Sequence, residues 1–372
     1  MPATIHPNER ILRLNALLHL GWDDRLADEF TPYADAGLVP GRVVVQHRGV
    51  SVVTTADGDL RCGTAGRLAY EAAGPGDLPA VGDWVAVAAR ADEGTGTIQA
   101  VLPRRTKFSR KVAWSAAEEQ VVAANVDTVF LLTSLNEDLN LRRLERYLTL
   151  AWESGAQPVL VLTKIDLDPE RVAQAVRDIE SVAFGVPVHA ISTVTGEGLD
   201  ALRAHILPGR TVALLGSSGV GKSTLVNTLA GREVLAVREI REDDGEGRHT
   251  TTHRQLVLLP DGGLVLDTPG MREIQLWESA EGLEEAFADV EELASQCRFG
   301  DCAHRSEPGC AVQAALEEGR LDAARWSSYK KLQRELEHLE RRLDKRAQSE
   351  ARKRWAQAGA EGRANMRLKG RR

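Results

Sequence analysis

The sequence predicts a fold in three parts: a small closed β-barrel, an α/β unit on a parallel sheet, and a helical segment with a cysteine-rich cluster. Short β-rich runs with Gly and Asp turns between them occupy residues 41–103, and continuous apolar runs alternate with helix-length stretches over residues 120–270. Three of the four cysteines crowd into residues 297–310. Apolar strands alternating with helices indicate a parallel doubly wound sheet, and the 372-residue length suits two or three domains.

Composition places the chain among globular proteins. With 43% hydrophobic and 27% charged residues, wholesale disorder is excluded. No run approaches the ~20 apolar residues of a membrane span. The apolar stretch Ile11–Leu20 carries Arg13 and His19 and lacks the small-residue cleavage site of a signal peptide. We therefore expect a cytoplasmic protein without membrane contact, and we expect it to be a monomer.

The amino-terminal part is predicted to hold a helical lead and the barrel. Residues 1–35 form the lead, with its helix expected over Ile11–Phe30, and residues 36–110 form the barrel. Five or so short strands in about 65 residues suggest an OB-like barrel, although SH3-like barrels have similar strand statistics. The clearest strands are expected at Val43–Gln46, Val50–Thr54, Trp84–Ala89 and Ile98–Leu102.

The α/β unit is expected over residues 111–278. Its apolar runs, which are typical of strands buried on both faces, are Val126–Leu132, Val159–Thr163, Val188–Ser192, Val212–Gly216 and Leu264–Asp267. The helix-length stretches among them include Leu141–Trp152, Pro169–Val182 and Lys222–Ala230.

A glycine-rich turn follows the fourth of these apolar runs and opens a helix. It matches G-x-x-x-x-G-K-[ST], the pattern of a phosphate-binding loop, in the strand-to-helix context that supports it. Glycines let backbone N–H groups converge on phosphate oxygens, and the helix N-terminus adds its dipole. Lys222 is expected to reach the β- and γ-phosphates and Ser223 to hold Mg²⁺. The nucleotide-binding residues of the loop are Gly216, Ser217, Ser218, Gly219, Val220, Gly221, Lys222, Ser223 and Thr224.

A second motif indicates which base is bound. Thr163, Lys164 and Asp166 form T-K-x-D at the end of an apolar run. A carboxylate there can accept two hydrogen bonds from the N1–H and exocyclic amine of guanine, a pair of donors that adenine lacks, while the lysine stem covers the ring face. Ser192 and Thr193, at the end of the next strand, are expected to supply the backbone contact to the guanine oxygen.

A third motif indicates the metal side of the site. Asp267 ends an apolar run and Gly270 follows it in D-T-P-G, as a magnesium aspartate and a γ-phosphate-sensing glycine should. Thr251 lies on the intervening loop and is expected to complete the Mg²⁺ shell with Ser223 and Asp267 when the γ-phosphate is present.

The motifs do not identify a single residue that assists hydrolysis. Met271 stands where many GTPases place a water-orienting Gln, and a thioether cannot orient water. His249 is the best substitute, although a solvated loop histidine explains it equally well. The candidate catalytic residues are Lys222, His249 and Thr251.

The order of these motifs is unusual. T-K-x-D precedes the phosphate loop and the metal aspartate comes last, whereas ordinary GTPases begin with the phosphate loop. Because domain termini commonly lie close together at the surface, the motifs indicate a circularly permuted P-loop α/β GTPase domain.

The cysteine-rich cluster is expected to bind zinc within a small helical domain at residues 279–345. Three thiolates and an imidazole make a closed set suited to one tetrahedral structural zinc ion, and soft sulfur ligands argue against Mg²⁺ or Ca²⁺. The alternative is three buried free cysteines beside an unrelated histidine. The candidate zinc ligands are Cys297, Cys302, His304 and Cys310.

With these motifs in place, the sequence resembles the bacterial family of circularly permuted, ribosome small-subunit-dependent GTPase A proteins. The resemblance covers nearly the whole chain and includes A-V-G-D-W-V at residues 80–85, residues 247–252 and the cysteine cluster. It implies a GTP hydrolase that matures the small ribosomal subunit at a late stage, binds its rRNA and leaves on GTP hydrolysis. The rival functions are a metabolic P-loop kinase and a GTP-switched RNA-binding protein outside ribosome assembly.

Basic segments are the candidate RNA contacts. The formal net charge of −7 argues mildly against a nucleic-acid partner, but residues 346–372 carry nine Lys or Arg and two acids, which leaves −14 on the rest. Residues 104–111 hold five basic side chains and no acid. We interpret this strip as an RNA contact beside the barrel, or else as an exposed linker, and the basic tail as a phosphate-binding arm or a solvated terminus.

Overall fold

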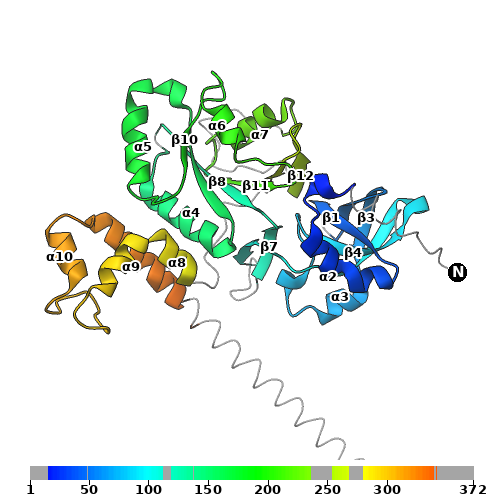
Figure 1. Ribbon diagram of the computed structural model, residues 1–372, viewed down its shortest axis with the longest axis horizontal. Helices are drawn as coiled ribbons and strands as arrows, with labels where there is room; N and C mark the ends of the chain where they lie inside the picture. The colour runs from blue at the N-terminus through cyan, green and yellow to red at the C-terminus, as the bar shows by residue number, and fades with distance from the viewer. Residues whose placement is uncertain are drawn as a thin grey trace, which may run out of the picture.

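The computed structural model describes residues 16–47, 49–111, 119–136, 138–235, 254–267, 280–338 and 341. Its parts follow one another along the longest axis of the molecule, with the barrel at one end and the carboxyl-terminal helices at the other (Figure 1). Within those ranges, no helix combines the length and the apolar character that crossing a membrane requires.

The barrel is formed by five strands that close on themselves. Their order is β1-β2-β3-β5-β4, and β4 pairs back onto β1. A short helix, α3 (Gly66–Glu71), lies between the third and fourth strands. This Greek-key arrangement favours the OB-like barrel over the SH3-like alternative. The strands are β1 (Val39–Gln46), β2 (Ser51–Thr55), β3 (Gly58–Thr64), β4 (Trp84–Arg90) and β5 (Thr95–Val101).

The lead differs from the single helix expected over Ile11–Phe30. Residues 11–15 lie outside the described part, and beyond them the chain forms a 3₁₀ turn, η1 (Leu18–Leu20), and then α2 (Asp24–Asp35). Gly21 separates them with φ +89°, a conformation that ends a helix. Asp23 then starts α2 by accepting a hydrogen bond from the backbone N–H of Leu26, as N-capping residues do.

The α/β unit contains the expected parallel sheet. Its strand order is β10-β9-β8-β11-β13-β12, and each of the five apolar runs contributes a parallel strand. The sixth strand, β12, is antiparallel to β13. The strands are β8 (Thr128–Ser134), β9 (Gln157–Thr163), β10 (Val188–Ala190), β11 (Thr211–Gly216), β12 (Arg254–Leu258) and β13 (Leu264–Asp267).

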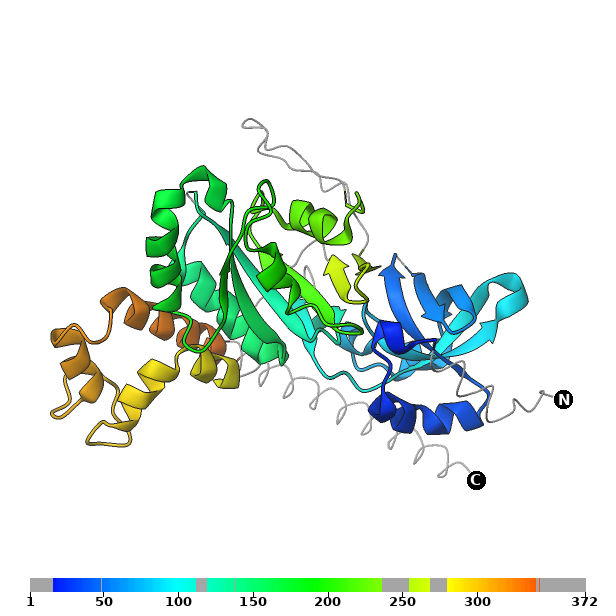
Figure 2. The ribbon, with the colours of Figure 1, turned by 45° about the horizontal axis from the view of Figure 1, so that its top comes forward.

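Helices cover both faces of this sheet, as a doubly wound fold requires (Figure 2). Along β8, Leu131 belongs to the core that includes α4 and α5, whereas Phe130 and Leu132 belong to the core that includes α6 and α7. The alternation follows from the two-residue period of a strand and explains why the run is apolar throughout. The helices are α4 (Leu141–Ser154), α5 (Val172–Glu180), α6 (Leu199–Arg203) and α7 (Lys222–Ala230).

The basic strip at residues 104–111 is part of the folded structure. It leads into β6 (Lys107–Lys111), which pairs with β7 (Glu119–Ala124) to form a hairpin. The Arg104 side chain is only 14% exposed and binds the buried Asp83 carboxylate. Three of the five basic side chains of the strip therefore pair with carboxylates of this chain. The ion pairs of the strip are Arg104–Asp83, Arg105–Asp23 and Lys107–Glu119.

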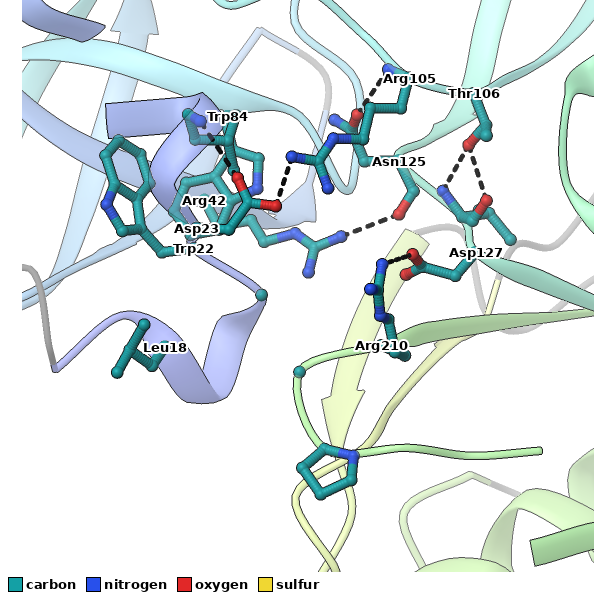
Figure 3. Close-up of a pocket in the computed structure, with 15 residues that line it drawn as sticks. Leu18, Trp22, Asp23, Arg42, Trp84, Arg105, Thr106, Asn125, Asp127 and Arg210 are labelled. Atoms are coloured by element: carbon teal, nitrogen blue, oxygen red, sulfur yellow. Dashed lines mark hydrogen bonds and ion pairs between the residues drawn. The ribbon is translucent and has the colours of Figure 1, made fainter. Parts of the chain in front are cut away.

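A buried arginine joins the lead, the barrel and the α/β unit. Burial lowers the pKa of Arg42 to about 10, so the side chain is still charged at neutral pH. A cavity of about 210 Å³ lies beside it and is also lined by the pairs Arg105–Asp23 and Arg210–Asp127 (Figure 3). The Arg42 guanidinium donates to the carbonyl oxygens of Leu20, Gly82 and Asn125 and to Thr211 Oγ1.

Arg42→Met should lower the free energy of unfolding by about 2 kcal/mol, because buried carbonyl groups lose their donor. Urea denaturation measures this change. Arg61→Met is the matched control, since Arg61 is exposed on β3 of the same barrel. Equal effects of the two substitutions would show that Arg42 does not hold the parts together.

The carboxyl-terminal helices dock on α4, where α8 lies beside it (Figure 1). Buried Arg325 pairs with Glu145 of α4 at 3.0 Å and with Asp289, and thereby links the two units. The helix at 323–338 turns Tyr329, Leu332 and Leu336 into the core, because residues three and four apart lie on one face of a helix. The other helices are α8 (Ala280–Ala286), α9 (Ala288–Ser295) and α10 (Ala311–Glu317).

Candidate nucleotide site and metal cluster

The nucleotide motifs meet at one edge of the parallel sheet. The carboxyl ends of parallel strands lie on the same side, and ligands bind there in doubly wound folds. β8 lies between β9, which ends in Thr163, and β11, which ends in Gly216. The T-K-x-D motif and the phosphate loop are therefore brought together although more than fifty residues separate them in sequence.

The phosphate loop has the expected strand–turn–helix form. Gly219 and Gly221 adopt φ values of +74° and +104°, which side chains disfavour, and α7 begins at Lys222. The Lys222 ammonium donates to the carbonyl oxygens of Gly216 at 2.8 Å and Ser217 at 2.5 Å. Ser223 and Thr224 lie in the first turn of α7, where backbone N–H groups are unpaired within the helix. The loop thus offers backbone N–H groups, a helix N-terminus and one cation at the same place.

The base motif is organised around a carboxylate and a hydroxyl. Lys164 has φ +60°, which turns the chain out of β9 so that Asp166 enters a short 3₁₀ turn. The Ser192 hydroxyl donates to Asp166 Oδ1 at 2.6 Å and accepts from the backbone N–H of Val194 and Thr195. Thr193 follows Ser192 in this loop. The structure therefore brings the T-K-x-D carboxylate and the Ser192 loop together, as expected.

Thr163 makes a contact that the motif does not reveal. Its hydroxyl donates to the carbonyl oxygen of Val220 in the phosphate loop at 2.7 Å, and its side chain is buried. Thr163 therefore fastens the base motif to the phosphate loop. The sequence offers no signal for this role, because the two residues meet only through the sheet.

Asp138 is a site residue that the sequence analysis missed. It follows β8 and accepts a hydrogen bond from the hydroxyl of Ser217, the second residue of the phosphate loop, at 2.7 Å. An isolated aspartate before a helix is also typical of surface turns, so its sequence context carries no functional signal.

Several predicted site residues lie wholly or partly outside the described part. His249, Thr251 and Gly270 are outside it, and of Asp267 only the backbone is described, at the end of β13. Their roles in magnesium binding and hydrolysis stay predictions.

The cysteine cluster has the dimensions of a tetrahedral metal site. The ligand atoms of Cys297, Cys302, His304 and Cys310 all lie within 4.8 Å of one another. Cys297 Sγ is 3.9 Å from Cys310 Sγ, and each of these sulfurs is 3.5 Å from His304 Nδ1. A tetrahedral zinc ion with ordinary bond lengths separates two sulfur ligands by about 3.8 Å and sulfur from nitrogen by about 3.6 Å. The donor set and its spacing fit zinc.

Neighbouring groups orient the cluster. Burial raises the pKa of the Cys297 thiol, but hydrogen bonds from the backbone N–H groups of Ala311 and Val312 and from the thiols of Cys310 and Cys302 together lower it by more, so the net shift is downward. Gln313 donates to the carbonyl oxygen of His304 at 2.6 Å. Backbone N–H groups of the same loop bind the Glu307 carboxylate and lower its pKa to about 2. Such outer contacts hold metal ligands in position.

The fold and the site define the class of protein. A phosphate loop and a guanine-type carboxylate stand at the edge of one parallel sheet, and the guanine motif comes first in the chain. These are the features of a circularly permuted P-loop GTPase. The sequence profile described as RsgA GTPase matches residues 101–277. The chain belongs to the RsgA GTPase family, which excludes the kinase alternative.

Named relatives and solved structures agree with this assignment. The protein of Opitutus terrae named small ribosomal subunit biogenesis GTPase RsgA is 48% identical over 367 residues, which cover 95% of this chain and 99% of that protein. The protein of the same name from Streptomyces coelicolor is 49% identical, with 95% and 96% covered. The crystal structure of YjeQ from Thermotoga maritima is 29% identical, with 80% and 98% covered and a TM-score of 0.61. That of YloQ, a circularly permuted GTPase, is 26% identical, with 81% and 96% covered and a TM-score of 0.57.

Proposed function

We propose that this GTPase is a late-stage maturation factor of the small ribosomal subunit, which binds rRNA and is released on GTP hydrolysis. The observation that carries the proposal is the similarity of nearly the whole chain, at 48% identity, to a protein named for small-subunit biogenesis. The same similarity supports GTP and GDP as ligands and a cytoplasmic location.

In the proposed reaction, water attacks the γ-phosphate of bound GTP. Lys222 stabilises the charge that develops on the phosphate oxygens, and Asp166 holds the guanine base. His249 orients the attacking water. Ser223, Thr251 and Asp267 would hold Mg²⁺, which would supply positive charge beside the β- and γ-phosphates.

The domains divide the work. We assign GTP hydrolysis to residues 111–278, rRNA contact to the barrel at 36–110 and to the tail at 346–372, and a structural role to the zinc-bearing segment at 279–345. Zinc is assigned as a staple because four protein ligands leave no open coordination position for chemistry. In the lead, assigned to residues 1–35, the described side chains of Trp22 and Phe30 pack on the barrel.

Sedimentation tests the proposed function. With a non-hydrolysable GTP analogue, the full-length protein is expected to comigrate with the small ribosomal subunit, and with GDP it should remain near the top of the gradient. The reason is that in GTPases in general the γ-phosphate orders the switch loops, which are released on hydrolysis.

Comigration with free structured RNA but not with the subunit would favour the alternative, a GTP-switched RNA-binding protein outside ribosome assembly. Absence of nucleotide-dependent redistribution toward either would contradict both functions. Addition of the large subunit in place of the small one is the matched control, because it presents the same phosphate charge without the proposed site.

A further inference from the structure

The loop between β8 and α4 holds Asp138 in a fixed position beside the phosphate loop. Its backbone N–H donates to Asn136 Oδ1 and its carbonyl oxygen accepts from the Thr133 hydroxyl, both at 3.1 Å. Arg143, in the first turn of α4, donates to Asp138 Oδ1 at 2.6 Å and also to the carbonyl oxygen of Asp138. The loop therefore holds the backbone of Asp138, and Arg143 of α4 holds its carboxylate.

A chain of hydrogen bonds runs from this carboxylate to the phosphate-loop lysine. The Ser217 hydroxyl donates to Asp138 Oδ1 at 2.7 Å. The carbonyl oxygen of the same serine accepts from the Lys222 ammonium at 2.5 Å. Because one residue makes both contacts, the orientation of the Ser217 backbone depends on Asp138, and the position of the ammonium depends on Ser217.

The charge balance around Asp138 is also informative. Asp138 Oδ2 is buried and has no hydrogen-bond partner among the described residues. A carboxylate beside a phosphate-binding loop repels the phosphates of a nucleotide, so its presence needs compensation. Arg143 supplies the compensating positive charge at 2.6 Å.

We propose that Asp138 is a positioning residue of the GTPase: it orients Ser217, and through Ser217 the phosphate loop and Lys222, while Arg143 neutralises it. This inference rests on the proposed role of residues 216–224 in binding GTP. Asp138 acts through Ser217 and is not assigned a contact with the nucleotide.

Four substitutions separate the effect of the Ser217–Asp138 hydrogen bond from the effect of the Asp138 carboxylate charge. Asp138→Asn keeps an oxygen that accepts from Ser217, Asp138→Ala removes the acceptor, and Ser217→Ala removes the donor. Arg143→Met leaves the carboxylate uncompensated next to the loop. Each alters one element of the proposed arrangement.

Binding of fluorescent GTP and GDP to the full-length protein tests the proposal. Asp138→Ala and Ser217→Ala are each expected to raise the Kd of both nucleotides about tenfold, since each loses one charge-assisted hydrogen bond. The double variant Asp138→Ala/Ser217→Ala should have a Kd no higher than that of either single variant, because the two residues act as one unit. Asp138→Asn should bind within about threefold of the parent protein, and Arg143→Met should bind more weakly than Asp138→Asn.

The control is Glu180→Gln, which removes an exposed carboxylate at the end of α5 and should leave both Kd values unchanged. Thermal unfolding midpoints of all variants identify any that have lost the fold. Additive effects in the double variant, unchanged Kd in Asp138→Ala, or an Asn variant as weak as the Ala variant would each overturn the proposal. If the parent protein itself fails to bind GTP, the assignment of the loop fails instead.

Discussion

Asp166→Asn is expected to raise the Kd for GTP by about 100- to 1000-fold, because a carboxylate that accepts two donors from guanine contributes on the order of 1.5–3 kcal/mol per hydrogen bond. An amide presents one oxygen and one NH₂ group. At least one N–H donor of guanine would therefore face the NH₂ group, with which it cannot form a hydrogen bond. The fold should tolerate the change, since the amide oxygen can still accept from Ser192, which lies 2.6 Å from Asp166 Oδ1.

Titration with two nucleotides makes this test specific. Xanthosine triphosphate carries an oxygen where guanine carries its exocyclic amine, so the NH₂ group of the Asn variant can donate to it. The variant should therefore prefer xanthosine triphosphate over GTP, and the parent protein should prefer GTP. Asp168→Asn is the matched control, because Asp168 lies two residues further on and pairs with Arg171. Unchanged GTP affinity in the Asp166 variant would exclude the guanine-binding role of the motif.

Removal of the cluster metal is the second large effect that we expect. Zinc binding contributes about 10 kcal/mol or more to the folding of small zinc domains, so its loss should unfold the loop around residues 297–310. Cys297→Ser should reduce bound zinc from one equivalent to almost none. The near-ultraviolet signal of Trp326 should change too, because its ring packs edge-on against His304 at a centroid distance of 5.6 Å.

The affinity for GTP after loss of zinc tests whether the zinc has a purely structural role. The cluster lies in the carboxyl-terminal unit, which meets α4 through Arg325 and Glu145, so GTP should still bind with Kd within about twofold. Cys62→Ala provides the control, since Cys62 is buried in the barrel and should leave zinc content unchanged. A collapse of GTP affinity on loss of zinc would contradict the staple role.

Much of the fold could be predicted from local patterns. Each of the five apolar runs of the α/β unit forms a parallel strand, because a strand covered by helices on both faces must be apolar at every position. α7 begins and ends at Lys222 and Ala230, as expected, because the glycine turn before it and Gly231 after it mark both ends. The four zinc-cluster residues meet because they are close in sequence.

Elements without such local signals were missed. β3 alternates exposed and buried positions and contains Gly58, Asp59 and Gly63, which are weak strand formers. β12 is one strand of the α/β sheet, yet it also pairs with β1 and so joins that sheet to the barrel in one eleven-stranded sheet of the described residues. The pairing of β1 with β12 could not be predicted, because strands more than two hundred residues apart carry no local sequence pattern that reports their pairing.

The sequence by itself determined the class of chemistry and the permuted order of the motifs, because the phosphate loop, the T-K-x-D motif and the cluster of three cysteines and a histidine each need particular atoms at short, regular spacing. Only the tertiary structure decided which groups the charged side chains contact. Arg104 neutralises Asp83 within the barrel, Arg42 joins three parts of the chain, and Asp138 reaches the phosphate loop from the end of another strand. These contacts depend on which distant segments the sheet brings together, and the free energy of a charge depends on that partner and its burial.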